Sequence, residues 1–232
     1  MSKQETTRRT FLGTAVAAAA GATLPTAVRG ATQEGPDAWI REVRGEHRCM
    51  FDFPQHKNGV PLLHILNYLS TYAAAYGTTT PQVGAVGTFY SIGVGSSIAM
   101  GFDDAMWDKY ALGEYHGLVD SSGRPYRRNV FHRPTAADAH LLAEAIGISL
   151  PMFGEAFPAM GIESLQGMGT KFLMCQNALN GWTSELEARG RGAQPEILAD
   201  LQNHLLPGVT LVPAMVIAIE KAQQAGIGYN RQ

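Results

Sequence analysis

Short apolar runs alternate with segments of helical periodicity over the second half of the chain. "KFLMC" (171–175) and "VTLVP" (209–213) are each followed by a stretch in which apolar residues recur every three or four positions. Glycines stop several of these stretches, and a proline stands in the first turn of others. A strand, a helix and a second strand in this order predict parallel strands joined by helical crossovers.

The first half of the chain continues the same pattern. It begins with "HRCMFDFP", a strand closed by Pro54, and leads through the loop "QHKNG" into a helix from Pro61 to Gly77. Thr135 precedes a later helix, and a second helix is interrupted at Pro158. We therefore predict an α/β fold, an open and mostly parallel sheet with helices on both faces in a three-layer sandwich. Its strands number about five and are expected at 48–53, within 82–93, and at 170–175, 209–213 and 227–230.

One domain accounts for residues 47–232 in this prediction. Residues 32–46 are polar and mixed in character, and we expect them to form a leader outside the core. Residues 113–134 combine turn residues with no clear period, which indicates an insertion or a long loop. The chain has 232 residues, 45% of them hydrophobic, which suits one domain with a proper core.

The first 31 residues form a segment of a different kind. Arg8 and Arg9 stand just before Phe-Leu and a weakly apolar stretch that has no charge until Arg29. This order is typical of a twin-arginine export signal, and it predicts recognition by the Tat translocase and a periplasmic or otherwise exported protein. We expect no other segment to span a bilayer.

The charge of the mature chain argues against nucleic acid as a partner. Removing residues 1–31 takes away four basic residues and one acidic residue, so the formal net charge changes from −2 to −5. Proteins that neutralise phosphates usually carry a basic excess, and the one local basic cluster here is "RPYRRN" at 124–129.

Candidate chemistry lies in three loops that follow predicted strands, because ligands of such sheets bind at the carboxyl ends of the strands. Cys175 is the strongest candidate nucleophile, since it stands where a helix begins. Its thiolate or persulfide is expected to accept from the backbone N–H groups of Gln176 and Asn177. Free cysteine is also among the most buried residue types, so a purely structural Cys175 is the alternative. The candidate ligand-binding side chains in the other two loops are Gln55, His56, Asn58 and Ser91, and His56 is a candidate neighbour of the thiol.

Other motifs are weak or missing. Cys49 and Cys175 are expected to stay free thiols, because their strand positions differ by about 13 Å. "GVGSSI" (93–98) has Ile98 where a dinucleotide fingerprint needs its third glycine. The seven histidines show no short ligand spacing, so no metal site is predicted, although one built from distant positions stays open. The motifs predict no cofactor, and a nucleophile elbow and a Walker loop are both missing.

The carboxyl-terminal third resembles the DsrE/DsrF-like family of small sulfur-relay proteins. "KFLMCQNALNG" and "LLPGVTLVPAMVIAIEKAQQAGIGY" carry the resemblance over residues 170–232, and "FDFPQHKNG" extends it loosely into the first half. The resemblance implies an α/β domain that assembles as a homo-oligomer, a trimer or a hexamer. It also implies that Cys175 accepts persulfide sulfur and passes it on. The chain departs from these mostly shorter, cytoplasmic proteins by its export signal and by residues 113–134.

Two hypotheses of function follow. In the first, the chain is an exported DsrE-like sulfur carrier or sulfurtransferase that accepts sulfane sulfur on Cys175 from a donor and transfers it to an acceptor thiol. In the second, it is a non-enzymatic periplasmic protein that binds a small ligand or cofactor, or assists assembly, and Cys175 is structural. Reactivity of the native thiol near neutral pH distinguishes the two hypotheses.

Overall fold

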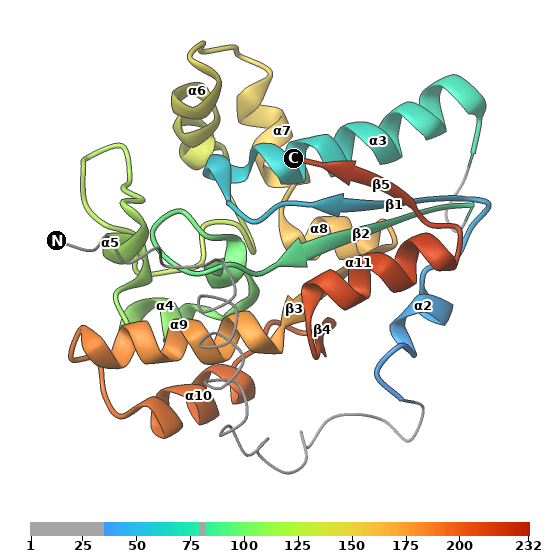
Figure 1. Ribbon diagram of the computed structural model, residues 1–232. Helices are drawn as coiled ribbons and strands as arrows, with labels where there is room; N and C mark the ends of the chain where they lie inside the picture. Colours follow the sequence, from blue (N-terminus) through green and yellow to red (C-terminus); the bar gives the residue numbers. More distant parts are fainter. Residues whose placement is uncertain (1–34, 79–81) are drawn as a thin grey trace, which may run out of the picture. The chain divides into compact units, whose positions relative to one another are not determined.

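Five parallel strands form one sheet in the order β4-β3-β2-β1-β5 (Figure 1). The computed structural model describes residues 35–78 and 82–232, and the unit from Pro36 to Gln232 is the one discussed below. The predicted export signal with Arg8 and Arg9 lies outside the described residues. The strands are β1 (His47–Asp52), β2 (Val83–Phe89), β3 (Thr170–Cys175), β4 (Val209–Val212) and β5 (Gly228–Arg231).

The helices follow the predicted order along the chain. An aspartate begins the helix after β2, because the Asp103 carboxylate caps the amide of Met106 at 3.2 Å. Thr135 and Asp138 form a reciprocal capping box where the predicted helix after residue 135 begins. The helices are α2 (Trp39–Glu42), α3 (Val60–Tyr76), α4 (Asp104–Lys109), α5 (Leu112–His116), α6 (His140–Ile146), α7 (Phe153–Ala159), α8 (Ile162–Gly167), α9 (Gln176–Ala188), α10 (Gln194–Asn203) and α11 (Met215–Gln224), with 3-10 turns η1 (Lys57–Gly59), η2 (Ser97–Gly101) and η3 (Ala136–Ala139).

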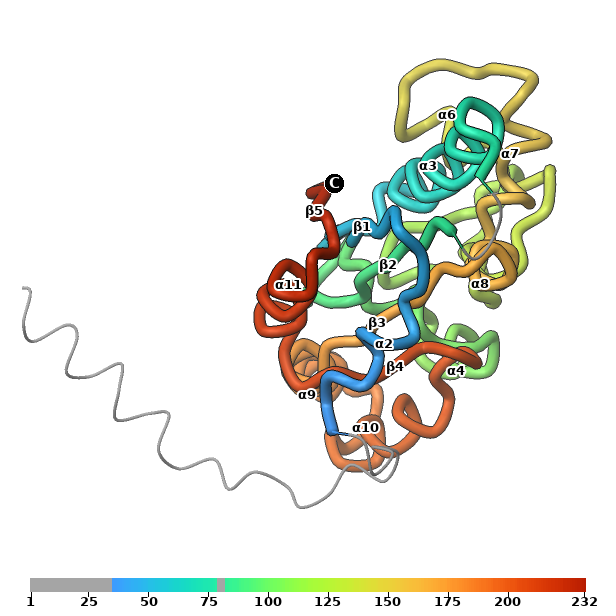
Figure 2. The backbone as a smooth tube through the Cα atoms, turned by 90° about the vertical axis from the view of Figure 1, so that its right-hand side faces the viewer, coloured from blue at the N-terminus to red at the C-terminus, as the bar shows by residue number. Residues whose placement is uncertain are grey.

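Two apolar clusters lie on opposite faces of the sheet, and this confirms the predicted three-layer α/β sandwich. Figure 2 shows the helices on the two sides of the strands. The larger cluster, the main core, packs α3 to α10 against one face. Its largest fully buried side chains are Phe51, Phe53, Phe89, Phe102, Trp107, Phe131, Phe157, Phe172 and Trp182. The smaller cluster, the second core, packs α2 and α11 against the other face and consists of Trp39, Val43, Met50, Val86, Leu173, Cys175, Val212, Met215, Ala218, Ala222 and Ile227.

The predicted polar leader is wrong in one respect, because part of it belongs to the core. Trp39 is 1% exposed and Val43 is 3% exposed, and both pack in the second core. The two residues are four positions apart, so they reach the same side of the short α2 segment and its C-cap. Their burial was not predicted because most of the neighbouring residues in the sequence are charged or polar.

Residues 113–134 also differ from a plain loop. They contain most of α5, and the irregular segment after it sends Tyr126, Val130 and Phe131 into the main core. An isolated bridge between Val119 and Pro125 closes the turn in this segment. The segment is therefore part of the packed domain, and it contributes His116 to the imidazole pair described below.

The two cysteines are free thiols, as predicted. Cys49 pairs with Ala85, and Ala85 pairs with Thr170 at the opposite end of β3 from Cys175. The offset between the two cysteines is therefore five residues, about 16 Å along the strands, which no disulfide spans. Within 35–78 and 82–232, no helix is long and apolar enough to cross a membrane.

Candidate functional site

Cys175 lies where the chain leaves two neighbouring strands toward opposite faces of the sheet. It ends β3 and pairs with Val212, the last residue of β4. From β3 the chain enters α9, which packs in the main core, whereas from β4 it enters α11, which packs in the second core. Open α/β sheets often bind their ligands at switch points of this kind. The predicted location of Cys175 at the carboxyl edge of the sheet is confirmed.

The thiol is held by the amino-terminal turns of two helices. Its Sγ atom accepts from the backbone N–H of Ala178 in α9 at 3.4 Å and from that of Met215 in α11 at 3.3 Å. The residue is 5% exposed. Both helices direct the positive end of their dipoles toward this sulfur, an arrangement that favours negative charge on it.

The predicted donors to the thiol need correction. The amide of Asn177 donates to the carbonyl of Pro213 at 3.3 Å, so it is not a donor to Cys175. The backbone N–H of Gln176 is not among the donors to Sγ in the described chain either. The side chain of Gln176 bonds to Asn180 at 2.7 Å and to Gln202 at 3.0 Å, which ties α9 to α10. Because the second donor comes from a residue 40 positions further on, local sequence could not reveal it.

A line of polar side chains on the same face as Cys175 escaped the sequence reading. Asp52 lies two residues after Met50, which packs in the second core, so strand alternation directs its carboxylate to that face. This carboxylate accepts from the hydroxyl of Tyr229 at 2.7 Å and from that of Thr88 at 3.5 Å. The alternation of strand residues was the signal that could have found this line.

Tyr90 extends this polar line toward the thiol. It follows Phe89, whose partner on β3 is Met174, so the parallel register brings Tyr90 beside Cys175 at the edge of the sheet. Burial raises the pKa of the Tyr90 phenol above its usual range, and the hydrogen bond to Asp52 raises it further. The phenol is therefore protonated at neutral pH, and its O–H donates to the Asp52 carboxylate.

The loops after β1 and β2 lie against each other, which brings two of the three predicted loops together. Gln55 forms an isolated bridge with Ser96, and the amide of His56 donates to the Gly95 carbonyl at 2.9 Å. Ser91 has a left-handed backbone, with φ of 74°. Asn58 extends its side chain to Glu144 in α6 at 3.5 Å, away from this contact.

His56 belongs to a buried imidazole pair with His116, a residue that sequence reasoning did not single out. Each is 5% exposed, and their ring centroids are 5.5 Å apart. Burial lowers the pKa of His56 to about 4 and that of His116 to about 3, with further contributions to His116 from His56 and Arg189. His56 also contacts Phe131 of the main core, whereas Cys175 packs in the second core. Among the described residues no hydrogen bond joins His56 to Cys175.

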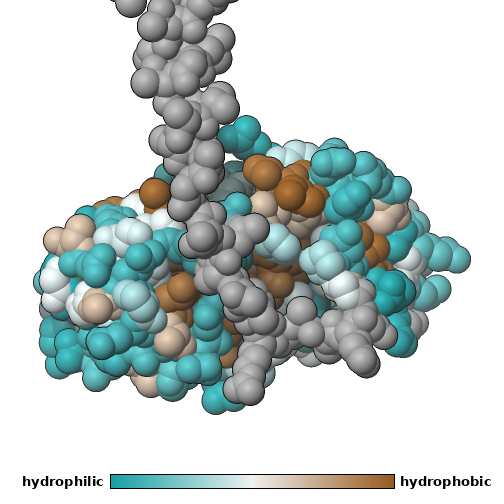
Figure 3. Space-filling model, turned by 60° about the horizontal axis from the view of Figure 1, so that its bottom comes forward, coloured by the Kyte–Doolittle hydropathy of each residue, from teal (hydrophilic) through white to brown (hydrophobic). Residues whose placement is uncertain are grey.

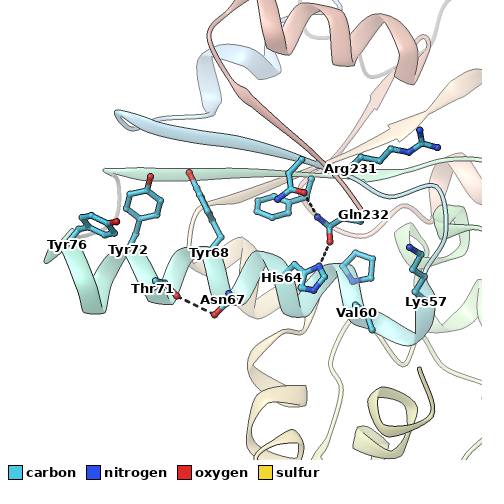
Figure 4. A pocket seen from close by; sticks show the side chains of 13 residues that line it. Lys57, Val60, His64, Asn67, Tyr68, Thr71, Tyr72, Tyr76, Arg231 and Gln232 are labelled. Atoms are coloured by element: carbon cyan, nitrogen blue, oxygen red, sulfur yellow. Dashed lines mark hydrogen bonds between the residues drawn. The ribbon is translucent and has the colours of Figure 1, made fainter. Parts of the chain in front are cut away.

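A groove of about 710 Å³ lies elsewhere, between α3 and the β5 edge of the sheet (Figure 4). Tyr68, Tyr72 and Tyr76 follow one another along α3 on one side of the groove, with neighbouring rings 5.0 and 5.2 Å apart. His64 contacts the side chain of Gln232 at the other end. Three strand spacings separate β5 from β3, so the β5 edge of the groove is about 14 Å from the strand of Cys175.

The face drawn in Figure 3 is mostly hydrophilic where it is coloured, with hydrophobic patches among the polar residues. Four of the protein's exposed hydrophobic residues belong to the segments that flank Cys175. Val216 and Ile217 follow Met215 in α11, and Ile92 and Val94 lie in the loop after β2; they are between 48% and 73% exposed. Among residues 35–78 and 82–232, no group of three or more His, Cys, Asp or Glu side chains could hold a metal ion.

Comparisons with known proteins add little to this geometry. No family model and no curated protein matches the chain. A solved structure, that of a protein of unknown function from Methanobacterium thermoautotrophicum, is similar at 16% sequence identity and a TM-score of 0.36. That match covers 81% of this chain and all of the other.

Proposed function

We propose that the protein is an exported sulfur carrier of the DsrE-like type, in which Cys175 is the sulfur acceptor. The observation that supports this most directly is the pair of backbone N–H donors on its Sγ atom, one from each helix at the switch point. Hydrogen bonds to an ionised sulfur are about twice as strong as those to a neutral group. Both donors therefore lie on the sulfur that attacks the donor persulfide and that becomes the inner sulfur of the product.

The reaction is an exchange of sulfane sulfur with no net oxidation. The thiolate of Cys175 attacks the outer sulfur of a donor persulfide, the donor's S–S bond breaks, and the donor leaves as a thiolate. A second attack by an acceptor thiolate on the outer sulfur of the Cys175 persulfide returns the cysteine to its thiolate form.

The remaining parts of the proposal concern place and partners. The export signal with Arg8 and Arg9 supports transport by the Tat route to the periplasm, and the family resemblance supports a homo-oligomer, a trimer or a hexamer. The exposed residues Ile92, Val94, Val216 and Ile217 flank the thiol, and they support docking of the sulfur donor or acceptor.

Intact mass spectrometry tests the proposal. We expect the mature protein to gain the mass of one sulfur atom after incubation with a persulfide donor, and a second thiol to remove it. Cys175→Ser should gain nothing. Cys49→Ser is the matched control and should gain the sulfur like the wild type, because burial raises the pKa of the Cys49 thiol and keeps it protonated. Circular dichroism of both variants checks that each has folded.

Two results would contradict the proposal. One is a wild-type protein that gains no sulfur under conditions in which a small thiol does. The other is an equal gain in the wild type and in folded Cys175→Ser.

A second candidate function is non-enzymatic binding of a small ligand or cofactor, with a structural Cys175. The observation that favours it is the pair of buried imidazoles, because their Nε2 atoms have no hydrogen-bond partner. Labelling of the native protein with iodoacetamide near neutral pH separates the two functions. Rapid alkylation of Cys175 supports sulfur transfer, whereas a silent thiol together with an absorbing ligand in the purified protein supports binding.

A further inference from the structure

The two edges of the sheet differ in how far they are covered. β4 forms one edge, and its residues Val209–Val212 are buried or half-buried. β5 forms the other edge, and all its residues, Gly228–Arg231, are exposed (Figure 1). An uncovered edge presents N–H and C=O groups that can pair with a strand of another chain. β5 is therefore the edge at which this sheet can accept a further strand.

The register shows which backbone groups of β5 are free. The N–H of Gln232 donates to the Asp52 carbonyl at the end of β1, at 2.9 Å. Backbone groups of successive residues alternate between the two sides of a strand, so those of Tyr229 and Arg231 point away from β1. Within residues 35–78 and 82–232, neither of these two residues makes a backbone hydrogen bond to a segment outside the sheet. Each of them thus offers one donor and one acceptor to an added strand.

The groove of about 710 Å³ between β5 and α3 lies directly beside this edge. Tyr68 and Tyr72 are half-buried and Tyr76 is 73% exposed, so a row of aromatic rings forms the α3 wall (Figure 4). Asn230 pairs with Phe51 of the main core, which places the groove on the main-core face of the sheet. Because strand side chains alternate between faces, every second residue of a strand added to β5 would enter the groove.

The charge of the groove favours an acidic occupant. Its lining residues include Lys57 and His64, and none of them is Asp or Glu. Among the described residues Lys57 makes no ion pair. Figure 4 shows Lys57 near Gln232, at the carboxyl end of β5, whereas the guanidinium of Arg231 is turned away from the groove. An acidic side chain at this end of an added strand would therefore meet an unpaired ammonium group.

A second copy of the chain fits the groove poorly. If two copies paired through β5 about a two-fold axis normal to the sheet, Gly228, Asn230 and Gln232 of one copy would face the tyrosines of the other. None of these three residues has an apolar side chain that could fill an aromatic groove. A small ligand, in turn, would leave the free backbone groups of β5 unused. An extended segment of another protein uses both the edge and the groove.

We propose that β5 and the α3 groove bind an extended segment of a partner protein as an additional strand. Aliphatic or aromatic residues at alternate positions of the segment pack against the tyrosines, and an Asp or Glu lies at the Lys57 end. The main-chain hydrogen bonds supply affinity and the groove selects the side chains. This site does not depend on the sulfur chemistry, because Cys175 packs in the second core, on the other face of the sheet.

The test removes one free N–H of the edge and leaves the ladder to β1 intact. Proline is tolerated in an edge strand where its nitrogen faces away from the sheet, so Arg231→Pro deletes an outward donor selectively. Arg231→Ala is the matched control, because it loses the same side chain and keeps the N–H. The probes are heptapeptides selected on the wild type from a random library displayed on phage, then synthesised and titrated by calorimetry.

A second pair of variants tests the groove separately. Lys57→Glu reverses the charge at its end, and Lys221→Glu, on α11 and outside the groove, is the matched control. We expect Lys57→Glu to bind the selected peptides about fivefold more weakly, while Lys221→Glu binds them like the wild type. Replacing the acidic residue of a peptide by Lys should reverse this preference.

We expect the selected peptides to share alternate apolar residues and an acidic residue toward one end. Their affinity should be roughly tenfold lower for Arg231→Pro than for Arg231→Ala, since the proline cannot donate to the added strand. Binding to the wild type should slow hydrogen exchange at the amides of Tyr229 and Arg231.

Three results would overturn the proposal. The first is a selection on the wild type that enriches no peptide of this pattern. The second is equal affinity of the selected peptides for Arg231→Ala and folded Arg231→Pro, which would place their binding site elsewhere. The third is a native assembly that sedimentation shows to dissociate in Arg231→Pro and to persist in Arg231→Ala, which would assign the β5 edge to a second copy of the chain.

Discussion

The backbone N–H of Met215 donates to Sγ of Cys175 across 3.3 Å, and this contact joins α11 to the end of β3. Ala178 donates to the same sulfur from α9. The thiol thus lies between helices that pack on opposite faces of the sheet. This relationship supports the proposed sulfur chemistry, and it can be changed without touching the cysteine.

Replacing Met215 by proline removes this donor selectively. Met215 is the first residue of α11, where proline is well tolerated, and Ala214 before it is already extended, with φ −149° and ψ 134°. Met215→Ala is the matched control, because it loses the same buried side chain and keeps the N–H. We expect Cys175 to gain sulfur roughly tenfold more slowly in Met215→Pro than in Met215→Ala, because this N–H lies on the sulfur that attacks the donor. Equal rates of mass gain would show that this N–H does not stabilise the attacking thiolate.

The histidine pair predicts that the protein loses stability as the pH falls from about 6.5 toward 4. The folded-state pKa values of His56 and His116 are about 4 and about 3, below the usual 6.5, so over this range the unfolded chain binds more protons. Each histidine should contribute a slope of about 1.4 kcal/mol per pH unit to the free energy of unfolding. Urea denaturation at several pH values measures the slope. His116→Asn should flatten it, and an unchanged slope would argue against a neutral, buried His116.

The protein should lose further stability at more acidic pH, when the carboxylate of Asp138 becomes protonated. Burial raises the pKa of its carboxyl group, but hydrogen bonds from Arg128, Thr135 and Tyr126 outweigh burial, and the net pKa is below its usual range. A depressed pKa contributes stability above the unfolded-state value of about 4, and that stability is lost as the pH falls through the folded-state value.

Asp138→Asn tests this assignment. We expect the variant to be destabilised by about 2–3 kcal/mol at pH 7, because it loses charged hydrogen bonds. The difference from the wild type should shrink below pH 4, where the wild-type carboxylate also becomes protonated. Asp108→Asn, at the exposed end of an ion pair with Arg127, is the control and should change the stability by less than about 1 kcal/mol. A pH-independent difference for Asp138→Asn would contradict the assignment.

Gly113 lies in close contact with the backbone of Tyr126, and this contact positions α5 and its His116. A Cβ atom at this position would lie 2.2 Å from the carbonyl oxygen and 2.7 Å from the amide nitrogen of Tyr126, and neither backbone atom can move as a flexible side chain would. We expect Gly113→Ala to lower the free energy of unfolding by more than about 2 kcal/mol. In Gly154→Ala the Cβ meets nothing within 4 Å, so α7 should gain up to about 1 kcal/mol. Thermal unfolding of the two variants gives the comparison, and equal melting temperatures would contradict the contact.

Local periodicity was enough to predict the strands and most of the helices. The run that ends at Cys175 and the helix after it follow from adjacent residues, since strand alternation and helical spacing act over a few positions. The burial of Trp39 could not be predicted from local periodicity. It depends on α11 and Ile227, which are distant in the chain. The place of Cys175 at the end of its strand was predicted correctly, whereas the two predicted backbone donors to its sulfur were not the ones found.

The sequence by itself determined a parallel α/β sheet with a cysteine at its carboxyl edge, because strand and helix patterns are local properties of the chain. Only the tertiary structure decided which groups meet there. The amide of Met215 reaches Cys175 from 40 residues away, and His116 reaches His56 from a segment without periodicity. Both contacts arise from the packing of helices on the two faces of the sheet, and such packing depends on residues that are far apart in the chain.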